Sequence, residues 1–364
     1  MNGVITSEIS EQQAKDNEAY ERLAKALDKL PNGFPQTPAR LDLKILKKIF
    51  SPEETALAGQ LSGHWEDVEE IAKRVGLTAE DTAKKLAAMV PRGMVRLDQQ
   101  TGTSRYRLAP FLVGFYEAQL KLMDHELAHL VEDYFANGGA AGIMKPEPAH
   151  HRVIPTQQAV KSEWILPYDD VRAILQSAKV FHVQDCICRV QQAQIGHKCE
   201  FPANTCLSFS NLERPPVPGD ITQAEALALL DKLEEAGLVH AVSNVMSFGY
   251  ICNCCGCCCA ILRGITVWGI EKSVAAANYY ADIDPALCVG CGICRDRCQV
   301  HAIANQDGVS VVTREKCIGC GLCVTGCPNS AAILNKKPEA EIVTPPADFA
   351  AWEHARLHNR GLGD

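Results

Sequence analysis

Two runs of four cysteines with the same internal spacing lie near the C-terminal end of the chain. They are Cys288-x2-Cys291-x2-Cys294-x3-Cys298 and, 29 residues later, Cys317-x2-Cys320-x2-Cys323-x3-Cys327, which is followed by Pro328. A cysteine thiolate is a soft ligand that suits iron–sulfur clusters and zinc. A cubane [4Fe–4S] cluster needs four thiolates, so the repeat predicts two such clusters.

The residues around the two runs repeat as well. The stretch Leu287-Cys-Val-Gly-Cys-Gly-Ile-Cys corresponds to Lys316-Cys-Ile-Gly-Cys-Gly-Leu-Cys. These motifs resemble the bacterial ferredoxins that hold two [4Fe–4S] clusters, and the resemblance implies that the fourth cysteine of each run crosses to the other cluster. The expected ligand sets are Cys288, Cys291, Cys294 and Cys327 for one cluster, and Cys317, Cys320, Cys323 and Cys298 for the other.

Glycines and one substitution accompany these runs. Gly290, Gly292, Gly319 and Gly321 suit a backbone that wraps a cluster, because glycine has no Cβ. Gln299 stands where such ferredoxins usually carry a proline, which concerns the local turn and not the ligation. Structural zinc on C-x2-C pairs is the alternative, but it would leave Cys294 and Cys323 surplus.

Ten further cysteines lie between residues 186 and 259. Cys186 and Cys188 follow a β-like run, and alternate residues of a strand share a face. With Cys199 and Cys206, which come just downstream, they are the first choice of ligands for a further [4Fe–4S] cluster. Arg189 or Lys198 would offset its negative charge.

The second group of middle cysteines is too dense for every thiol to bind one metal. It reads Cys252-Asn-Cys254-Cys255-Gly-Cys257-Cys258-Cys259. Cys252, Cys254, Cys257 and Cys258 are the second choice of ligands, since C-x-C and C-x2-C spacings let neighbouring thiols converge. Small buried side chains explain Cys255, Cys258 and Cys259 equally well. A single centre shared by both groups and a zinc site stay open.

The elements that must position these residues form a multidomain α+β chain. The middle domain is expected to be irregular and the C-terminal domain to have the two-cluster ferredoxin fold. The predicted parts are a helical arm (1–40), a winged-helix-like module (41–110), a connecting helix (111–137), a cysteine-rich metal-binding domain (150–275), the ferredoxin domain (281–335) and a polar tail (336–364).

The N-terminal module is predicted from the order of its elements. A helix from Leu41 that ends near residues 60–63, a helix over 66–75 and a third helix capped at Thr78 precede a hairpin with strands near 94–98 and 105–108. This order, with the phrase Ile71-Ala-Lys-Arg-Val-Gly-Leu77, resembles a winged-helix domain. The third helix carries as many acidic as basic residues, so DNA is not expected as a partner. Residues 111–135 are predicted to form one long amphipathic helix that connects two domains.

Composition places these parts in a folded protein of the cytoplasm. The chain has 364 residues, 18 of them cysteine, with a net charge of −8 and 47% hydrophobic residues. Its first residues lack the basic start and apolar core of a signal peptide, and cytoplasmic thiols stay reduced. The most apolar stretch, 242–270, is interrupted by polar residues and cysteines, so no transmembrane segment is expected.

One further motif, H-E-x-x-H, is not interpreted as a zinc site. His125-Glu126-Leu-Ala-His129 spells H-E-x-x-H, which places two imidazoles on one helix face beside a general base. The downstream third zinc ligand is not defined, so we interpret the match as a polar helix face.

These observations predict an iron–sulfur electron-transfer protein that passes single electrons and is a subunit or partner of an anaerobic cytoplasmic oxidoreductase. Similar cysteine-dense regions precede ferredoxin domains in oxidoreductase subunits of anaerobes. The expected partner is a flavin or metal oxidoreductase. The alternatives are a redox-responsive winged-helix transcription regulator and a reductase with a catalytic central metal centre. No nucleotide-binding motif and no catalytic residue is identified.

Overall fold

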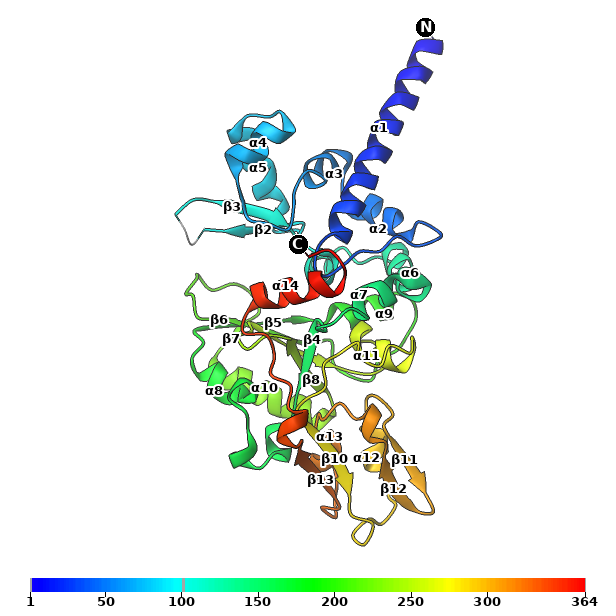
Figure 1. Cartoon of the computed structure of the whole chain (residues 1–364), viewed down its shortest axis with the longest axis vertical. Helices are drawn as coiled ribbons and strands as arrows, with labels where there is room; N and C mark the ends of the chain where they lie inside the picture. The colour runs from blue at the N-terminus through cyan, green and yellow to red at the C-terminus, as the bar shows by residue number, and fades with distance from the viewer. Residues whose placement is uncertain (1, 100–101, 364) are drawn as a thin grey trace. The chain divides into compact units, whose positions relative to one another are not determined.

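The computed structural model describes residues 2–99 and 102–363, and these fold into two compact units (Figure 1). One unit contains the chain up to Ile143 and again from Arg356 onward, and the other contains Met144–Ala355. The mixture of helices and antiparallel sheets agrees with the predicted multidomain α+β class. None of the described helices combines the length and the apolar character needed to cross a bilayer.

The first unit consists of helices and a small sheet of order β1-β3-β2. The predicted helices and hairpin are present, but the first predicted helix is divided, because Ser51 and Pro52 start a new helix with a capping box. The elements are α1 (Asn2–Asp28), α2 (Leu41–Ile49), α3 (Pro52–Ala58), β1 (Glu66–Asp67), α4 (Val68–Val75), α5 (Ala79–Met89), β2 (Val95–Asp98) and β3 (Arg105–Leu108).

The prediction of one long connecting helix over residues 111–137 is wrong. Leu112 and Val113 have extended backbone angles inside the turn η1 (Phe111–Phe115), and α6 (His125–Tyr134) starts separately at the Asp124 cap. The turns η2 (Glu117–Gln119) and η3 (Phe135–Gly139) and helix α7 (Ala140–Met144) complete this segment. Phe111 and Phe115 pack their rings 5.3 Å apart in a buried aromatic cluster, and this packing outweighs the helical periodicity.

The second unit is built on a six-stranded antiparallel sheet of order β4-β8-β9-β6-β5-β7. The predicted irregular middle domain is therefore a regular sheet with helices. Its core contains Leu175, Leu207, Leu230, Val242 and Ile251. The elements are β4 (His151–Ile154), α8 (Val171–Gln176), β5 (Val180–Asp185), α9 (Ile187–Gln194), β6 (Asn204–Ser210), β7 (Asp220–Ile221), α10 (Gln223–Ala236), β8 (Val239–Ser243), β9 (Tyr250–Cys254) and α11 (Ala260–Thr266), with the turns η4 (Gln157–Ala159), η5 (Ser162–Trp164) and η6 (Pro167–Asp169).

The cysteine repeat near the C-terminus forms a small two-part module in the same unit. Each cysteine run enters a four-residue helix, and two antiparallel strand pairs, β10–β13 and β11–β12, complete the module. The Thr156 N–H donates to the Cys320 carbonyl at 2.9 Å, so the module is bonded to the sheet domain. The elements are β10 (Tyr279–Ile283), α12 (Ile293–Asp296), β11 (Ile303–Gln306), β12 (Val309–Val312), η7 (Arg314–Lys316), α13 (Leu322–Thr325) and β13 (Ala332–Lys336).

The segment 336–364, predicted as a polar tail beyond the last structured part, contains the turn η8 (Glu339–Glu341) and the helix α14 (Phe349–Asn359). The indole of Trp352 is buried and donates to the Ala149 carbonyl at 3.0 Å. Arg356 is fully buried, and its Nε donates to the Pro31 carbonyl at 2.7 Å. These contacts explain why a mostly polar sequence is ordered.

His151 on β4 should make the stability of the second unit depend on pH. Its ring is buried, its Nε2 lies 3.0 Å from the Tyr250 hydroxyl, and burial lowers the pKa of His151 to about 4. In the unfolded chain the His151 imidazole takes up a proton near pH 6.5, whereas in the folded protein it does not. The free energy of unfolding therefore decreases as the pH falls below this value. We expect this group to cost about 2 kcal/mol between pH 7 and pH 5.

The measurement is urea unfolding of the full chain at both pH values, followed by circular dichroism under anaerobic conditions. His151→Gln should lose less stability than the wild type on acidification. The exposed His197→Gln is the matched control and should behave like the wild type. Equal pH dependence in His151→Gln and the wild type would contradict the assignment.

Candidate metal centres

The first middle cysteines lie at a strand-to-helix junction and not on a strand. Strand β5 ends at Asp185, Cys186 caps helix α9, and Cys188 lies in its first turn. The Cys186 N–H donates to the Ala203 carbonyl at 2.8 Å, which turns the chain out of the sheet. The expectation that both thiols share a strand face is therefore wrong.

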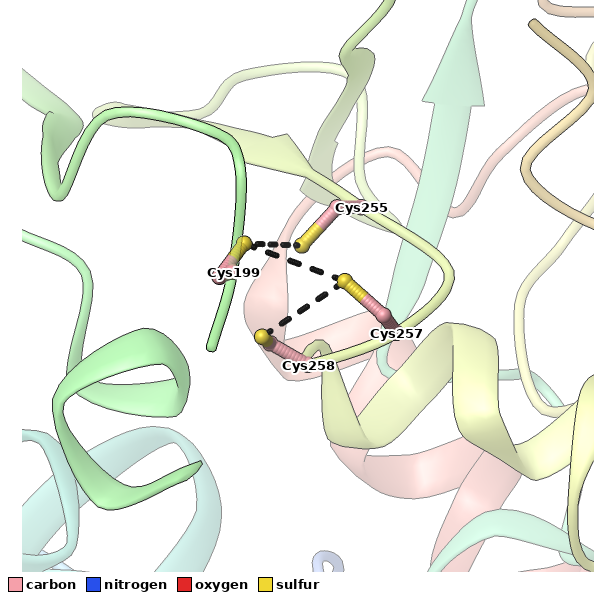
Figure 2. Close-up of side chains that lie close together, drawn as sticks. All are labelled: Cys199, Cys255, Cys257 and Cys258. Atoms are coloured by element: carbon pink, nitrogen blue, oxygen red, sulfur yellow. Dashed lines mark hydrogen bonds between the residues drawn. The ribbon is translucent and has the colours of Figure 1, made fainter. Parts of the chain in front are cut away.

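Four thiols form a compact group that we call the four-thiol site (Figure 2). Its sulfurs belong to Cys199, Cys255, Cys257 and Cys258, and all lie within 4.8 Å of one another. The Cys199 Sγ lies 3.8 Å from the Sγ atoms of both Cys255 and Cys257, and the Cys257 and Cys258 sulfurs are 3.7 Å apart. Cys199 comes from the loop after α9, and the other three come from the turn between β9 and α11.

The other six middle cysteines form what we call the six-thiol group. Cys252 and Cys254 alternate on β9, and β9 pairs with β6, which carries Cys206. Cys259 caps α11, and its thiol contacts those of Cys188 and Cys254. The thiol contacts run in the order Cys206, Cys252, Cys254, Cys259, Cys188, Cys186.

The structure brings together neither of the two predicted ligand sets. In the first-choice ligand set, Cys199 belongs to the four-thiol site, whereas Cys186, Cys188 and Cys206 belong to the six-thiol group. From the second choice, Cys257 and Cys258 separate from Cys252 and Cys254. Neither predicted ligand set contained Cys255 or Cys259. One signal was available in the sequence: adjacent residues on an extended backbone point apart, which places Cys254 and Cys255 in different groups.

Arg189 lies between the two groups and carries a buried positive charge. Its side chain is 3% exposed, and it donates to the Thr205 hydroxyl at 2.6 Å and to the Asn253 carbonyl at 2.9 Å. It also contacts the Cys255 thiol, and it lies near Cys186 and Cys199. The hydrogen bond from Cys258 and the charge of Arg189 hold the pKa of the Cys255 thiol well below its usual range. These two contacts therefore favour the thiolate form of Cys255.

The C-terminal cysteines are arranged so that Cys298 lies near the second run. Burial, together with the neighbouring charges of Cys298 and Cys317, raises the pKa of Cys320 to about 12. Cys298 and Cys317 also act on the pKa of Cys323. This arrangement is the one that crossed ligation requires, and the ligand sets themselves stay a prediction.

The backbone around these cysteines fits a cluster. The Ala302 N–H donates to the Cys298 sulfur at 3.2 Å, and the N–H groups of Ala281 and Ser310 point at Cys317 and Cys288. Gly319 has a φ of 70°, and a Cβ there would lie 2.3 Å from the Tyr279 carbonyl oxygen. Amide donors to cysteine sulfur tune the potential of iron–sulfur clusters. The donor set therefore fits the predicted group.

Gln299 joins the C-terminal module to the four-thiol site. Its Oε1 accepts the N–H of Gly256 at 2.8 Å, and its Nε2 donates to the Gly237 carbonyl at 2.9 Å. Gly256 lies between Cys255 and Cys257, and Gln299 directly follows Cys298. A proline has no such side-chain groups, which accounts for glutamine at this position.

The H-E-x-x-H segment lies on α6. His125 and His129 stack with ring centroids 4.5 Å apart, but Glu126 accepts a hydrogen bond from Lys48. Within residues 2–99 and 102–363, the four-thiol site is the one group with three or more metal-binding side chains this close together. The interpretation of this segment as a polar helix face stays a prediction.

Comparison with known proteins identifies part of the chain. Residues 281–328 match a family model described as a 4Fe-4S dicluster domain. The search of curated proteins and the search of solved structures returned no match. The matched segment supports the binding of [4Fe–4S] clusters by the C-terminal cysteines.

Crossed ligation can be tested with Cys298→Ser. We expect this change to disturb the cluster held by Cys317, Cys320 and Cys323, because the Cys298 thiol lies beside them. Electron paramagnetic resonance of the reduced protein, kept anaerobic, should give the same spectrum for Cys298→Ser as for Cys320→Ser.

The matched control is Cys291→Ser, which should alter the other cluster. A Cys298→Ser spectrum that follows Cys291→Ser would contradict the crossed arrangement.

Proposed function

We propose that this protein is an iron–sulfur electron-transfer protein, acting as a subunit or partner of an anaerobic oxidoreductase of the cytoplasm. The observation that carries the proposal is the 4Fe-4S dicluster match over residues 281–328, with both cysteine runs inside it. When bound, [4Fe–4S] clusters accept and release one electron each with little rearrangement. The protein supplies the thiolates, the amide donors and the surrounding dielectric that tune the potentials.

The six-thiol group is where we propose a further iron–sulfur cluster. Its thiols contact one another in a continuous series, and Cys254 and Cys259 are buried. Six thiols exceed the four ligands of a single tetrahedral ion. A polynuclear cluster uses thiolates spread over a larger volume, and Arg189 beside Cys186 offsets part of their charge.

The contact at Gln299 supports electron exchange between the C-terminal module and the sheet domain. Gln299 follows one predicted cluster ligand and bonds to the turn that carries Cys255 and Cys257. Arg297 adds hydrogen bonds to the carbonyls of Glu234 at 2.8 Å and Glu235 at 2.7 Å, at the end of α10. These bonds hold the two parts at a constant separation, which efficient electron transfer requires.

The N-terminal module is better explained as a docking or structural element than as a DNA reader. We keep its likeness to a winged-helix domain as part of this proposal. Arg92 pairs with Glu54, Arg105 pairs with Asp98 at 2.6 Å, and Arg107 lies 4.6 Å from the ring centroid of Trp65. Arginines that already have partners within the module neutralise phosphate less readily, and DNA binding begins with phosphate neutralisation.

Gln299→Ala should weaken the contact between the C-terminal module and the sheet domain, which we call the junction. The loss of two hydrogen bonds should lower the free energy of unfolding of the second unit by about 1–3 kcal/mol. Pulsed reduction should show slower electron exchange between the ferredoxin clusters and the middle-domain cluster. The measurements are urea unfolding and rapid-freeze electron paramagnetic resonance under anaerobic conditions.

Gln306→Ala is the control, because Gln306 is exposed on β11. The stability and the electron-exchange rate of Gln306→Ala should both match those of the wild type. If Gln299→Ala behaves like this control, the junction has no role in electron exchange.

Metal analysis tests the proposed function directly. Anaerobically purified full chain should contain about twelve irons and as many sulfides, about eight in the ferredoxin module and about four in the six-thiol group. Reductive titration should consume about three electrons per chain. Cys188→Ser combined with Cys254→Ser should retain only the ferredoxin iron, about eight per chain.

The ferredoxin clusters serve as an internal measure of folding in that double variant. About eight irons in the wild type would remove the middle-domain cluster from the proposal, and an iron-free wild type would overturn the proposal as a whole.

A further inference from the structure

The four-thiol site differs in scale from the other cysteine groups of the chain. Its closest sulfurs are separated by 3.7–3.8 Å, and all four lie within 4.8 Å of one another. Among the residues that the structure describes, no ferredoxin cysteines and no members of the six-thiol group gather this tightly. The difference indicates a smaller occupant.

The sulfur spacing matches one tetrahedral ion. With metal–sulfur bonds of about 2.3 Å, the edge of a regular tetrahedron of thiolates is about 3.8 Å. A cubane cluster is larger, because four irons and four sulfides lie between its thiolates. The four-thiol site would have to expand to hold a cubane, whereas a single ion fits with the sulfurs where they are.

The surroundings of the site supply the balancing charge. Arg189 is 3% exposed, its Nε has no hydrogen-bond partner among the described residues, and its guanidinium contacts the Cys255 thiol. The ion pairs of the described chain give Arg189 no carboxylate, although a buried charge needs a partner of opposite sign. A divalent ion with four thiolates carries two net negative charges, and Arg189 offsets one of them.

The shell of the site is apolar on one side and open on the other. Leu233 and Leu238 pack with the buried Cys255 and Cys258, and Phe201 lies against this cluster. The side chain of Cys257 is exposed. An ion bound at this site would be accessible from solvent at Cys257 and would lie against apolar side chains on the other side.

We propose that Cys199, Cys255, Cys257 and Cys258 bind a single Zn²⁺ ion in a closed, structural site. Four protein ligands fill the tetrahedral coordination of zinc and leave no position for substrate. On binding, each thiol that is protonated releases its proton to solvent, and four metal–sulfur bonds form without any change of oxidation state. The ion ties the Cys199 loop to the turn that contains Gly256, whose N–H donates to Gln299.

This assignment is independent of the iron–sulfur function, because it concerns other thiols and another metal. The site would position the turn on which the C-terminal module docks. It would not carry electrons, since zinc has no redox chemistry in proteins.

The test is metal analysis of the full chain, purified anaerobically after growth with zinc and iron. We expect about one zinc per chain to survive dialysis against a weak chelator. Cys199→Ser combined with Cys257→Ser should lose the zinc and keep the iron. The matched control, Cys206→Ser combined with Cys254→Ser, should keep the zinc and lose middle-domain iron.

A wild-type measurement keeps the test independent of whether the variants fold. Zinc-edge X-ray absorption should show four sulfur neighbours at about 2.3 Å. Absence of zinc, iron at this site, or fewer than four sulfur ligands would overturn the assignment. Loss of iron with retention of zinc in the wild type would instead overturn the proposed electron-transfer function and leave the zinc site standing.

Discussion

A buried guanidinium that interacts with both groups of thiols is the interaction on which the middle domain depends. Arg189 contacts the Cys255 thiol and lies near Cys186 and Cys199, so one side chain faces both the four-thiol site and the six-thiol group. Removing a charge from water is costly unless a charge of opposite sign lies close by. Arg189 and the thiolate form of Cys255 meet this requirement for each other. The hydrogen bonds to Thr205 and Asn253 keep the guanidinium in place.

The antiparallel sheet brings the thiols to that side chain. Cys206 on β6 and Cys252 on β9 lie on paired strands, while Cys188 and Cys259 lie at the starts of the helices that follow β5 and β9. The turn at Gly256 carries Cys255, Cys257 and Cys258, and its Gly256 N–H donates to Gln299 of the C-terminal module. The cysteine groups of the sheet domain and the C-terminal module are therefore linked by hydrogen bonds within the second unit, as the proposed electron exchange between them requires.

Local patterns in the sequence described some segments well and others poorly. The cap at Thr78 predicted the start of α5, because this signal acts within a few residues. The helix expected over 111–137 failed because an aromatic cluster that includes Phe34, distant in sequence, determines the backbone there. Ordering of the C-terminal helix likewise depends on distant contacts of Trp352 and Arg356.

The sequence by itself indicated [4Fe–4S] binding by the C-terminal cysteines, because the ligands of such a motif lie at short, regular spacings along the chain. Chain spacing does not predict the thiol groups of the middle domain, because the cysteines that meet there are far apart in the sequence. Cys199 meets Cys255, Cys257 and Cys258, and Cys206 meets Cys252, only because strand pairing and the turn at Gly256 bring them together. The division of ten thiols into two groups is therefore a property of the tertiary structure, since sulfur–sulfur distances depend on the fold and not on chain spacing.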